Sequence, residues 1–264
     1  MQLLLWILVK TKQYVYMKDI FSVKDKVVIV TGAAKGNGKA IADGFVKAGS
    51  IVLYIDILDA VKDNAKLDKT GRSKSYIVDL TNERQVSQSI NSIGQVDTLV
   101  NNAGISLAPD TKDSHTNWDK TIGINLTSVY ELSRLVADIM IQNKGGSIIN
   151  ITSISSYLGS VGNPSYHASK GGVRYLTKSL AADYGKYNIR ANNLCPGYIN
   201  SDMTSESYMD ETKRKIVSER TMLGRWGRSN DLVGTCIFLA SDASSYITGS
   251  DILVDGGLIN KGFD

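Results

Sequence analysis

The sequence predicts an α/β fold: one domain with a doubly wound, parallel, seven-stranded sheet and helices on both of its faces. Seven apolar segments of strand length recur along the 264 residues, and each is followed by a polar or helical stretch. Hydrophobicity within these segments is continuous, which is typical of strands buried on both faces. Strands that alternate with helices form parallel sheets with right-handed crossovers. Because no linker or internal repeat marks a boundary, we expect a single domain.

The expected strands follow one another along the chain. They span residues 26–31, 51–56, 75–78, 98–102, 147–152, 189–194 and 251–255. The helix that begins near Tyr166 has an apolar face, because four of its residues stand at spacings of three and four. They are Val173, Leu176, Leu180 and Tyr184. This face predicts that the helix packs against the sheet.

The composition argues against several classes of protein. Hydrophobic residues make up 42% of the chain and charged residues 21%, which are ordinary values for a protein with a buried core. The net charge of +4 comes from 30 basic and 26 acidic residues that are interspersed, so we expect no nucleic-acid partner. Cys195 and Cys236 lie far apart, without other metal ligands at a suitable spacing. We therefore expect no metal site, no disulfide framework and a cytoplasmic location.

The beginning of the chain stands apart from the strand and helix pattern. We place an N-terminal extension at 1–18, outside the fold, and the domain at 19–264, because Met17 reads like a natural start ahead of the first strand. The apolar run from Leu3 to Val9 is too short to span a bilayer and lacks the features of a secretory signal. We expect no membrane partner; an interfacial anchor or a partner-binding strand is the alternative.

A glycine-rich loop follows the first strand and precedes an amphipathic helix. Gly32, Gly36 and Gly38 allow a tight turn and a close approach of the backbone, and the start of the helix favours a pyrophosphate. Asp56 ends the second strand, where a carboxylate can bind the adenosine ribose and repel a 2′-phosphate. Lys35, within the loop, could instead attract such a phosphate. We therefore expect NAD as the cofactor, with NADP as the less favoured alternative.

A second group of residues has the types needed for proton transfer. Tyr166 and Lys170 stand four residues apart, so on a helix they share one face. A nearby ammonium lowers the pKa of a tyrosine from its usual ~10, which suits general acid–base catalysis on an alcohol or a carbonyl. Ser153, thirteen residues before the tyrosine, would hydrogen-bond the same substrate oxygen. We interpret the three as a candidate catalytic set; a chance spacing on an ordinary helix is the alternative.

From about Asp19 to its C-terminus, the chain resembles the short-chain dehydrogenase/reductase family, which has the Rossmann fold. The motifs that carry the resemblance are TGAAKGNG (31–38), NNAG (101–104), Asn125, Ser153, YHASK (166–170), PG (196–197) and DGG (255–257). The C-terminal half is most similar to the branch that acts on sugar acids and polyols, such as gluconate 5-dehydrogenase. The order of several independent motifs makes the resemblance specific.

The resemblance implies which residues meet the cofactor. Asp79 would meet the adenine amino group, with Leu80 beside it, and the turn at 102–104 would lie against the adenine ribose. The turn at 196–197 and Ile199 would line the nicotinamide. The whole implied set is Gly32, Lys35, Gly36, Asn37, Gly38, Asp56, Asp79, Leu80, Asn102, Ala103, Gly104, Tyr166, Lys170, Pro196, Gly197 and Ile199.

The resemblance also assigns further roles and reveals one departure. Lys170 would hydrogen-bond the nicotinamide ribose and lower the pKa of the tyrosine, and Asn125 would hold a water in a proton relay. Asn37 stands where the family usually has isoleucine or leucine, which puts the contact near the cofactor in doubt. His167 should project about 100° around the helix from Tyr166, so we expect no catalytic role for it.

The implied activity is hydride transfer between the nicotinamide cofactor and a secondary alcohol or ketone of a small molecule, here a sugar acid or polyol. A 3-oxoacyl-[acyl-carrier-protein] reductase is one alternative. A regulatory protein that binds the cofactor without catalysis is an alternative from another class. The resemblance further implies a homotetramer built by helix pairing.

Substrate choice is expected in a helical lid at about 198–226, because such segments close over substrates and exclude water. Five basic side chains of this segment could favour an anionic substrate, or could simply be solvated. They are Lys213, Arg214, Lys215, Arg220 and Arg225.

Overall fold

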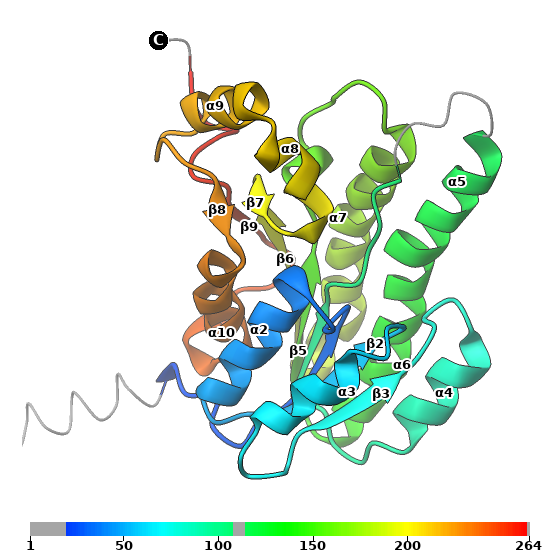
Figure 1. Ribbon diagram of the computed structural model, residues 1–264. Helices are drawn as coiled ribbons and strands as arrows, with labels where there is room; N and C mark the ends of the chain where they lie inside the picture. The colour runs from blue at the N-terminus through cyan, green and yellow to red at the C-terminus, as the bar shows by residue number, and fades with distance from the viewer. Residues whose placement is uncertain (1–19, 108–113, 263–264) are drawn as a thin grey trace, which may run out of the picture.

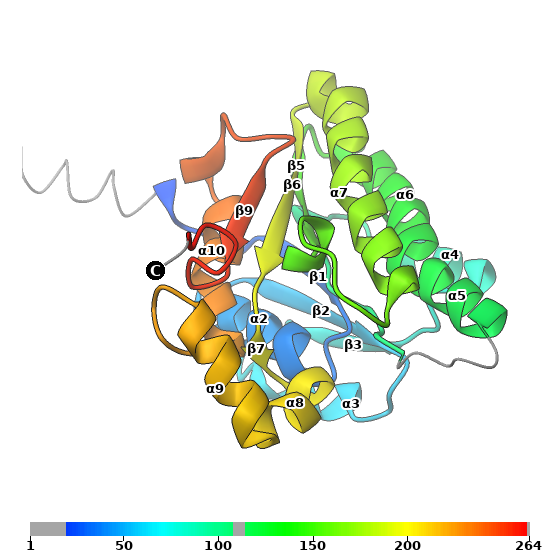
Figure 2. The same ribbon diagram turned by 90° about the horizontal axis from the view of Figure 1, so that it is seen from above.

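The computed structural model describes residues 20–107 and 114–262. The extension expected at 1–18 lies outside the described residues, so that expectation is not tested. Figures 1 and 2 show a central sheet with helices on both of its faces. No helix within the described ranges is both long and apolar enough to cross a membrane.

Seven parallel strands form the central sheet, in the order β3-β2-β1-β4-β5-β6-β9. Their bounds are Val27–Thr31 (β1), Ile51–Asp56 (β2), Lys74–Ile77 (β3), Thr98–Asn101 (β4), Gly146–Ile151 (β5), Ile189–Pro196 (β6) and Asp251–Val254 (β9). All seven expected strands are confirmed, with ends within two residues of the expected ones. β2 and β3 lie on one side of β1, whereas β4, β5, β6 and β9 follow on its other side. In folds of this kind, a crevice opens at the carboxyl ends of the strands where the strand order changes direction.

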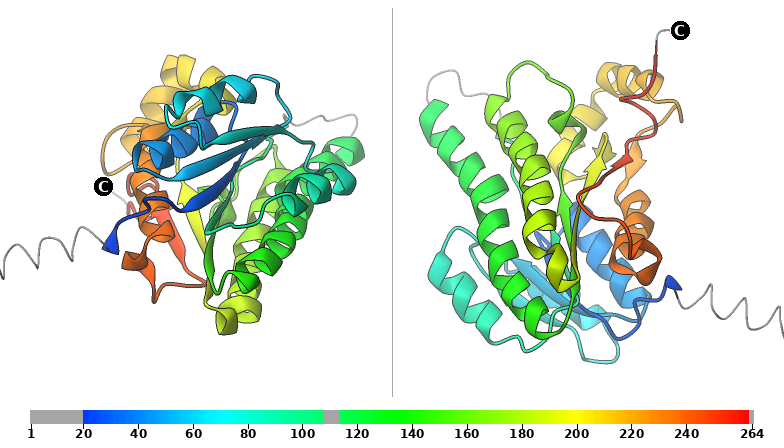
Figure 3. Two further views of the ribbon diagram at one scale, coloured as in Figure 1. Left: turned by 90° about the horizontal axis from the view of Figure 1, so that it is seen from below. Right: turned by 180° about the vertical axis from the view of Figure 1, so that it is seen from behind.

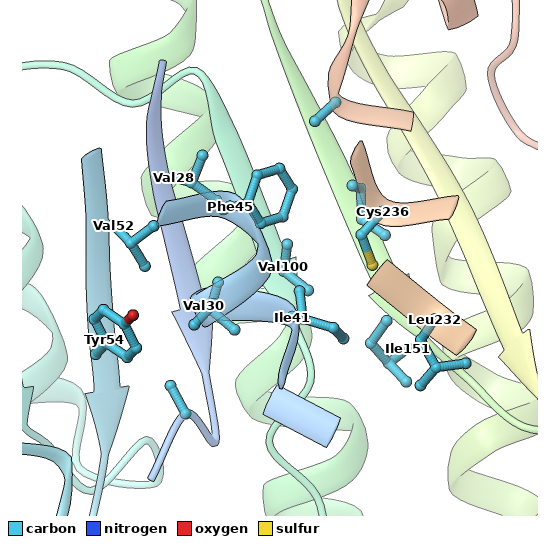
Figure 4. Close-up of a cluster of buried hydrophobic side chains, with 14 of the residues drawn as sticks. Val28, Val30, Ile41, Phe45, Val52, Tyr54, Val100, Ile151, Leu232 and Cys236 are labelled. Carbon is cyan, nitrogen blue, oxygen red and sulfur yellow. The ribbon is translucent and has the colours of Figure 1, made fainter. Parts of the chain in front are cut away.

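Helices form a layer on each face of the sheet (Figures 1 and 3). One layer holds α2 (Gly36–Lys47), α3 (Val61–Asn64) and α10 (Val233–Ala240). The other holds α4 (Glu83–Asn91), α5 (Ser114–Ile122), α6 (Ser128–Gln142) and α7 (Pro164–Tyr184). Each layer encloses its own apolar cluster. In the first, Phe45 and Ile41 of α2 pack on Val28, Val30 and Val100 of the sheet (Figure 4).

A row of hydrogen-bonded polar side chains crosses the sheet beneath α7. Asn101 (β4), Asn150 (β5), Asn193 (β6) and Asp251 (β9) are paired in register on adjacent strands. Asn101 Nδ2 donates to Asn150 Oδ1 (2.8 Å), and Asn193 Nδ2 donates to Asp251 Oδ1 (2.7 Å). Thr177 of α7 joins the two pairs: its Oγ1 accepts from Asn150 Nδ2 (2.8 Å) and donates to Asn193 Oδ1 (2.6 Å). We call these five residues the polar row.

The segment between β6 and α10 leaves the sheet and returns to it. Its ends pair as two short parallel strands, β7 (Ile199–Asn200) and β8 (Gly227–Arg228). Between them lie α8 (Ser205–Met209) and α9 (Glu211–Arg220), which stand above the carboxyl ends of the strands in Figure 1. The helical character expected for 198–226 is therefore present.

Candidate active site

A cavity of about 400 Å³ lies where the carboxyl ends of β1, β2, β4, β5 and β6 meet. Every residue that we expected to bind the cofactor lines it, and so does Ser153. Asn125 does not line it. Four further lining residues belong to the lid expected at 198–226: Ser201, Asp202, Met203 and Thr204. Seven others were not expected: Ile57, Leu58, Val78, Ile105, Ile124, Ile151 and Thr152. Most of these are chain neighbours of identified residues, so their position next to a strand end was the available signal.

The glycine-rich loop is a close-packed turn at the start of α2. Gly32 and Gly36 have φ angles of +64° and +57°, a region that favours glycine. A Cβ on Gly38 would overlap the carbonyl oxygen of Gly32 and the side-chain nitrogen of Asn102. Lys35, at the N-cap, makes no side-chain hydrogen bond to the first turn of α2. The first amides of the helix are therefore available to a phosphate group.

Asp56 and Lys35 both line the cavity next to this loop, and they have different partners. The Asp56 carboxylate accepts hydrogen bonds from the backbone nitrogens of Ala34 (2.8 Å) and Leu58 (3.0 Å), which fix it at the end of β2. Lys35 is exposed, and its Nζ lies 3.6 Å from the carboxylate of Asp202 in the segment before α8. Both side chains line the cavity, but backbone amides fix the carboxylate, whereas the ammonium lies near a second carboxylate.

Asn37, which lines the cavity, makes a long-range side-chain contact. Its Oδ1 accepts a hydrogen bond from the hydroxyl of Ser229 (2.8 Å), which begins the short helix that follows β8. The polar side chain of Asn37 therefore has a hydrogen-bond partner in the protein.

Ser153, Tyr166 and Lys170 converge on one wall of the cavity. Ser153 follows β5, and its Oγ accepts a hydrogen bond from the backbone nitrogen of Ser155 (3.0 Å), which orients the hydroxyl. Tyr166 and Lys170 stand on α7, with the Lys170 Nζ 5.8 Å from the centre of the tyrosine ring. That Nζ donates to the carbonyl oxygen of Ile151 (2.8 Å).

The pKa values of the pair follow from burial. Burial raises the pKa of Tyr166, and a hydrogen bond with Ser153 opposes this shift. Burial lowers the pKa of Lys170 to about 8. Burial and the Ser153 hydrogen bond are the two causes that shift the pKa of Tyr166, so the expected lowering by Lys170 stays a prediction.

Asn125 lies behind the cavity wall, in a π-helical turn (Gly123–Thr127) between α5 and α6. Its side chain is fully buried; Oδ1 accepts from the nitrogen of Ile105 (2.8 Å) and Nδ2 donates to the oxygen of the same residue (2.9 Å). A Cβ on Gly104 would lie 3.2 Å from Asn125 Oδ1 and 3.5 Å from Lys170 Nζ. Asn125 Oδ1 and Lys170 Nζ therefore both lie close to Gly104.

Other polar residues near the site have structural partners. His167 interacts through Nδ1 with the carbonyl oxygen of Asn163 (2.6 Å) and through Nε2 with Ser160, and it does not line the cavity. The five basic side chains of the lid segment do not line it either. Four of them pair with acidic side chains: Lys213 with Asp210, Arg214 with Glu211, Lys215 with Glu219 and Arg225 with Asp231. Among the described residues, no group of three or more His, Cys, Asp or Glu side chains could hold a metal ion.

Comparison with known proteins gives consistent matches over most of the chain. Residues 32–259 match a family described as enoyl-(acyl carrier protein) reductase. The 2-dehydro-3-deoxy-D-gluconate 5-dehydrogenase of Dickeya dadantii is 37% identical over 250 residues, which cover 92% of this chain and 99% of that one. A 3-oxoacyl-[acyl-carrier-protein] reductase of Thermotoga maritima is 36% identical over 243 residues, which cover 89% and 98% of the two chains.

A solved structure agrees with these relatives. The crystal structure of a gluconate 5-dehydrogenase from Burkholderia cenocepacia, in complex with NADP and tartrate, matches with a TM-score of 0.88 and 33% identity. The match covers 92% of this chain and 99% of that chain. The chain belongs to the short-chain dehydrogenase/reductase family. This short-chain dehydrogenase is accordingly an oxidoreductase that uses a nicotinamide cofactor to interconvert alcohols and ketones, and the expected fold is confirmed.

The buried ammonium of Lys170 predicts a pH dependence of stability. Its pKa in the folded enzyme, about 8, lies below its usual 10.5, so the unfolded chain binds this proton more readily. The contribution of Lys170 to the free energy of unfolding should therefore rise between pH 8 and 10.5. Lys170→Met should remove this rise, which is on the order of 3 kcal/mol. Denaturant unfolding of both proteins at several pH values measures the difference.

Lys178→Met is the matched control, because Lys178 is an exposed lysine of the same helix. It should leave the pH dependence of the wild type unchanged. Parallel stability curves for the wild type and Lys170→Met would contradict the assignment.

Proposed function

We propose that this enzyme interconverts a secondary alcohol and a ketone on a sugar acid or polyol, with Tyr166 as the acid and base. The observation that carries the proposal is a convergence of two groups. Ser153, Tyr166 and Lys170 line the same cavity as the glycine-rich loop and Asp56. Side chains suited to proton transfer and a loop suited to a dinucleotide thus line one cavity.

The features of the cavity fit a nicotinamide dinucleotide. The glycine-rich loop turns tightly, with Gly32 and Gly36 at positive φ, and the start of α2 offers amides that no side chain caps for the pyrophosphate. Asp56 would bind the adenosine ribose, Asp79 and Leu80 the adenine, and the turn at 102–104 its ribose. Pro196, Gly197 and Ile199 would line the nicotinamide. When bound, this group supplies the hydride chemistry.

Proton transfer would be handled by side chains of the protein. In oxidation, Tyr166 takes the proton of the alcohol while Ser153 hydrogen-bonds the same oxygen; in reduction the steps reverse. The Ser153 hydrogen bond, which lowers the pKa of Tyr166, favours the phenolate that oxidation needs. Lys170 and Asn125, which both lie close to Gly104, would continue the path of the proton toward solvent.

We infer NAD as the preferred cofactor. Asp56 supports this, because two backbone amides fix its carboxylate at the cavity, where a 2′-phosphate would meet a negative charge. Lys35, the cation that could offset this charge, lies near Asp202 instead. The Burkholderia relative was crystallised with NADP, so the cofactor choice of this chain requires its own measurement.

The relatives named for gluconate derivatives support a sugar acid or polyol as the substrate. We propose that the segment at 198–226 acts as the lid over this substrate. Five of its residues line the cavity: Ile199, Ser201, Asp202, Met203 and Thr204. Slower amide exchange in α8 and α9 when cofactor and substrate are both present would support the lid; unchanged exchange would argue against it.

Two alternatives remain as outcomes of the tests. The Thermotoga maritima relative favours a 3-oxoacyl-[acyl-carrier-protein] reductase as the second candidate. A regulatory protein without catalysis would have no use for the Ser153, Tyr166 and Lys170 set, which makes it the less favoured reading.

We also propose that the enzyme forms a homotetramer through helix pairing. Large side chains on the outer helix layer support this: Trp118 of α5, Tyr130 of α6 and Tyr175 of α7 are all exposed. Light scattering would measure the mass, and a monomer would refute the proposal.

A cytoplasmic location, which cell fractionation would test, is supported by the free thiols of Cys195 and Cys236.

Replacement of the proposed acid and base should stop turnover without loss of the cofactor. Tyr166→Phe removes one hydroxyl, so we expect kcat to fall by about a hundredfold to ten-thousandfold. Cofactor binding, measured by fluorescence titration, should stay near that of the wild type. Tyr175→Phe, at an exposed position of the same helix, is the matched control. Wild-type activity in Tyr166→Phe would refute the mechanism.

A panel of substrates tests the proposed specificity. Sugar acids, polyols and a 3-oxoacyl thioester, each offered with NAD(H) and with NADP(H), should give the highest kcat/KM for a sugar acid or polyol with NAD. Initial rates followed at the absorbance of the reduced cofactor provide the measurement. Robust turnover of the thioester alone, with NADPH, would overturn the substrate and the cofactor together.

A further inference from the structure

A cluster of three side chains outside the cavity joins the segment that carries Ser153 to the helix that carries Tyr166. The guanidinium of Arg174 lies over the ring of Tyr157, 3.8 Å from its centre. Arg174 Nε also donates to Asp251 Oδ2 (2.7 Å). None of the three lines the cavity, and no step proposed above uses them. We call Tyr157, Arg174 and Asp251 the Tyr157 anchor.

The anchor lies one helical turn beyond the proposed catalytic pair. Tyr166, Lys170 and Arg174 follow one another at intervals of four residues on α7, so they share one face. Arg174 is therefore fixed relative to the tyrosine by the helix itself. A movement of Arg174 relative to Tyr166 would require the helix to deform.

Tyr157 is coupled to Ser153 by a short hydrogen-bonded turn. Ser153 caps a 3₁₀ turn at Ile154–Ser156, and Tyr157 ends it. The nitrogen of Ser156 donates to the oxygen of Ser153 (3.0 Å), and the nitrogen of Tyr157 donates to the oxygen of Ile154 (2.9 Å). These bonds connect the backbone of Tyr157 to that of Ser153, so a displacement of Tyr157 can reach Ser153 through the turn.

Asp251 connects the Tyr157 anchor to the central sheet. Asp251 belongs to the polar row, where Asn193 Nδ2 holds its other oxygen at 2.7 Å. Its side chain is only 12% exposed and that of Arg174 26%, so the ion pair is shielded from water. Burial raises the pKa of Tyr157, and a hydrogen bond to Asp251 raises it further, which keeps the ring neutral under the guanidinium. The position of the anchor is thus determined by β9, β6 and α7 together.

We propose that Tyr157, Arg174 and Asp251 are positioning residues that set the Ser153 hydroxyl against Tyr166. The inference rests on the proposed function, in which these two hydroxyls meet the same substrate oxygen. The planar guanidinium is central, since it stacks on a ring while it hydrogen-bonds a carboxylate, which an ammonium on a flexible stem does less well.

The test compares turnover with cofactor binding in single variants. Tyr157→Ala removes the ring, and Arg174→Lys keeps the charge but loses the stacked plane. Both should lower kcat by about tenfold to a hundredfold, because a small displacement of a reacting group slows the chemical step. The dissociation constant of NADH should stay within about twofold of the wild type. Tyr157→Phe, which keeps the ring under the guanidinium, should restore most of kcat.

The pH profile separates positioning from a general loss of folded protein. Loss of the Ser153 hydrogen bond raises the pKa of Tyr166, so the half-maximal rate of alcohol oxidation should move to higher pH in Tyr157→Ala. An enzyme that is only destabilised would show a lower maximal rate, with the half-maximal rate at the same pH as in the wild type. That result, or a wild-type kcat in Tyr157→Ala, would overturn the inference.

Two parallel variants keep the outcomes distinct. Tyr187→Ala removes another tyrosine that lies under a cation, Lys186 Nζ at 5.0 Å, but beyond the other end of α7, and should leave kcat unchanged. Tyr166→Phe tests the proposed function itself. An inactive Tyr166→Phe beside a normal Tyr157→Ala would refute the anchor alone, whereas an active Tyr166→Phe would refute the mechanism on which the anchor depends.

Discussion

The arrangement of this molecule depends on the hydrogen bonds of the polar row, which cross four strands and reach into α7. Thr177 accepts from one asparagine and donates to the next, so the helix has one favoured position along the sheet. A shift of one residue would leave buried amides without partners, at a cost of roughly 1–3 kcal/mol each. Tyr166 and Lys170 therefore stand at a fixed height above the ends of β5 and β6.

The two halves of the cavity are fixed by different forces. Backbone packing shapes the cofactor half, where Gly32, Gly38 and Asn102 leave no space for larger side chains. Buried polar contacts shape the other half, where Ser153 is oriented by the turn that follows it and Lys170 by a strand carbonyl. One half of the cavity is thus fixed mainly by steric contact and the other mainly by hydrogen bonds.

Local patterns in the sequence predicted the strands, the glycine-rich loop and the helix that carries Tyr166 and Lys170, because each depends on residues close together in the chain. What they missed depends on distant residues. Asn37 appeared to disturb the cofactor contact until its partner, Ser229, was found 192 positions away. Asn193 and Asp251 look like ordinary polar residues at a strand and its edge, and only the strand register shows that they pair. The basic residues of the lid segment suggested an anionic substrate, but most of them pair with nearby acidic residues.

The pairing of β7 with β8 has a consequence for how such an enzyme can diversify. Ile199 and Asn200 lie beside Gly227 and Arg228, so the intervening segment leaves and rejoins the framework at almost the same place. Extra length in a segment with closely spaced ends costs little entropy and does not disturb the frame. Insertions and substitutions between these strands can accumulate while the sheet and α7 stay unchanged. The fold thus separates a segment that tolerates change from a framework that does not.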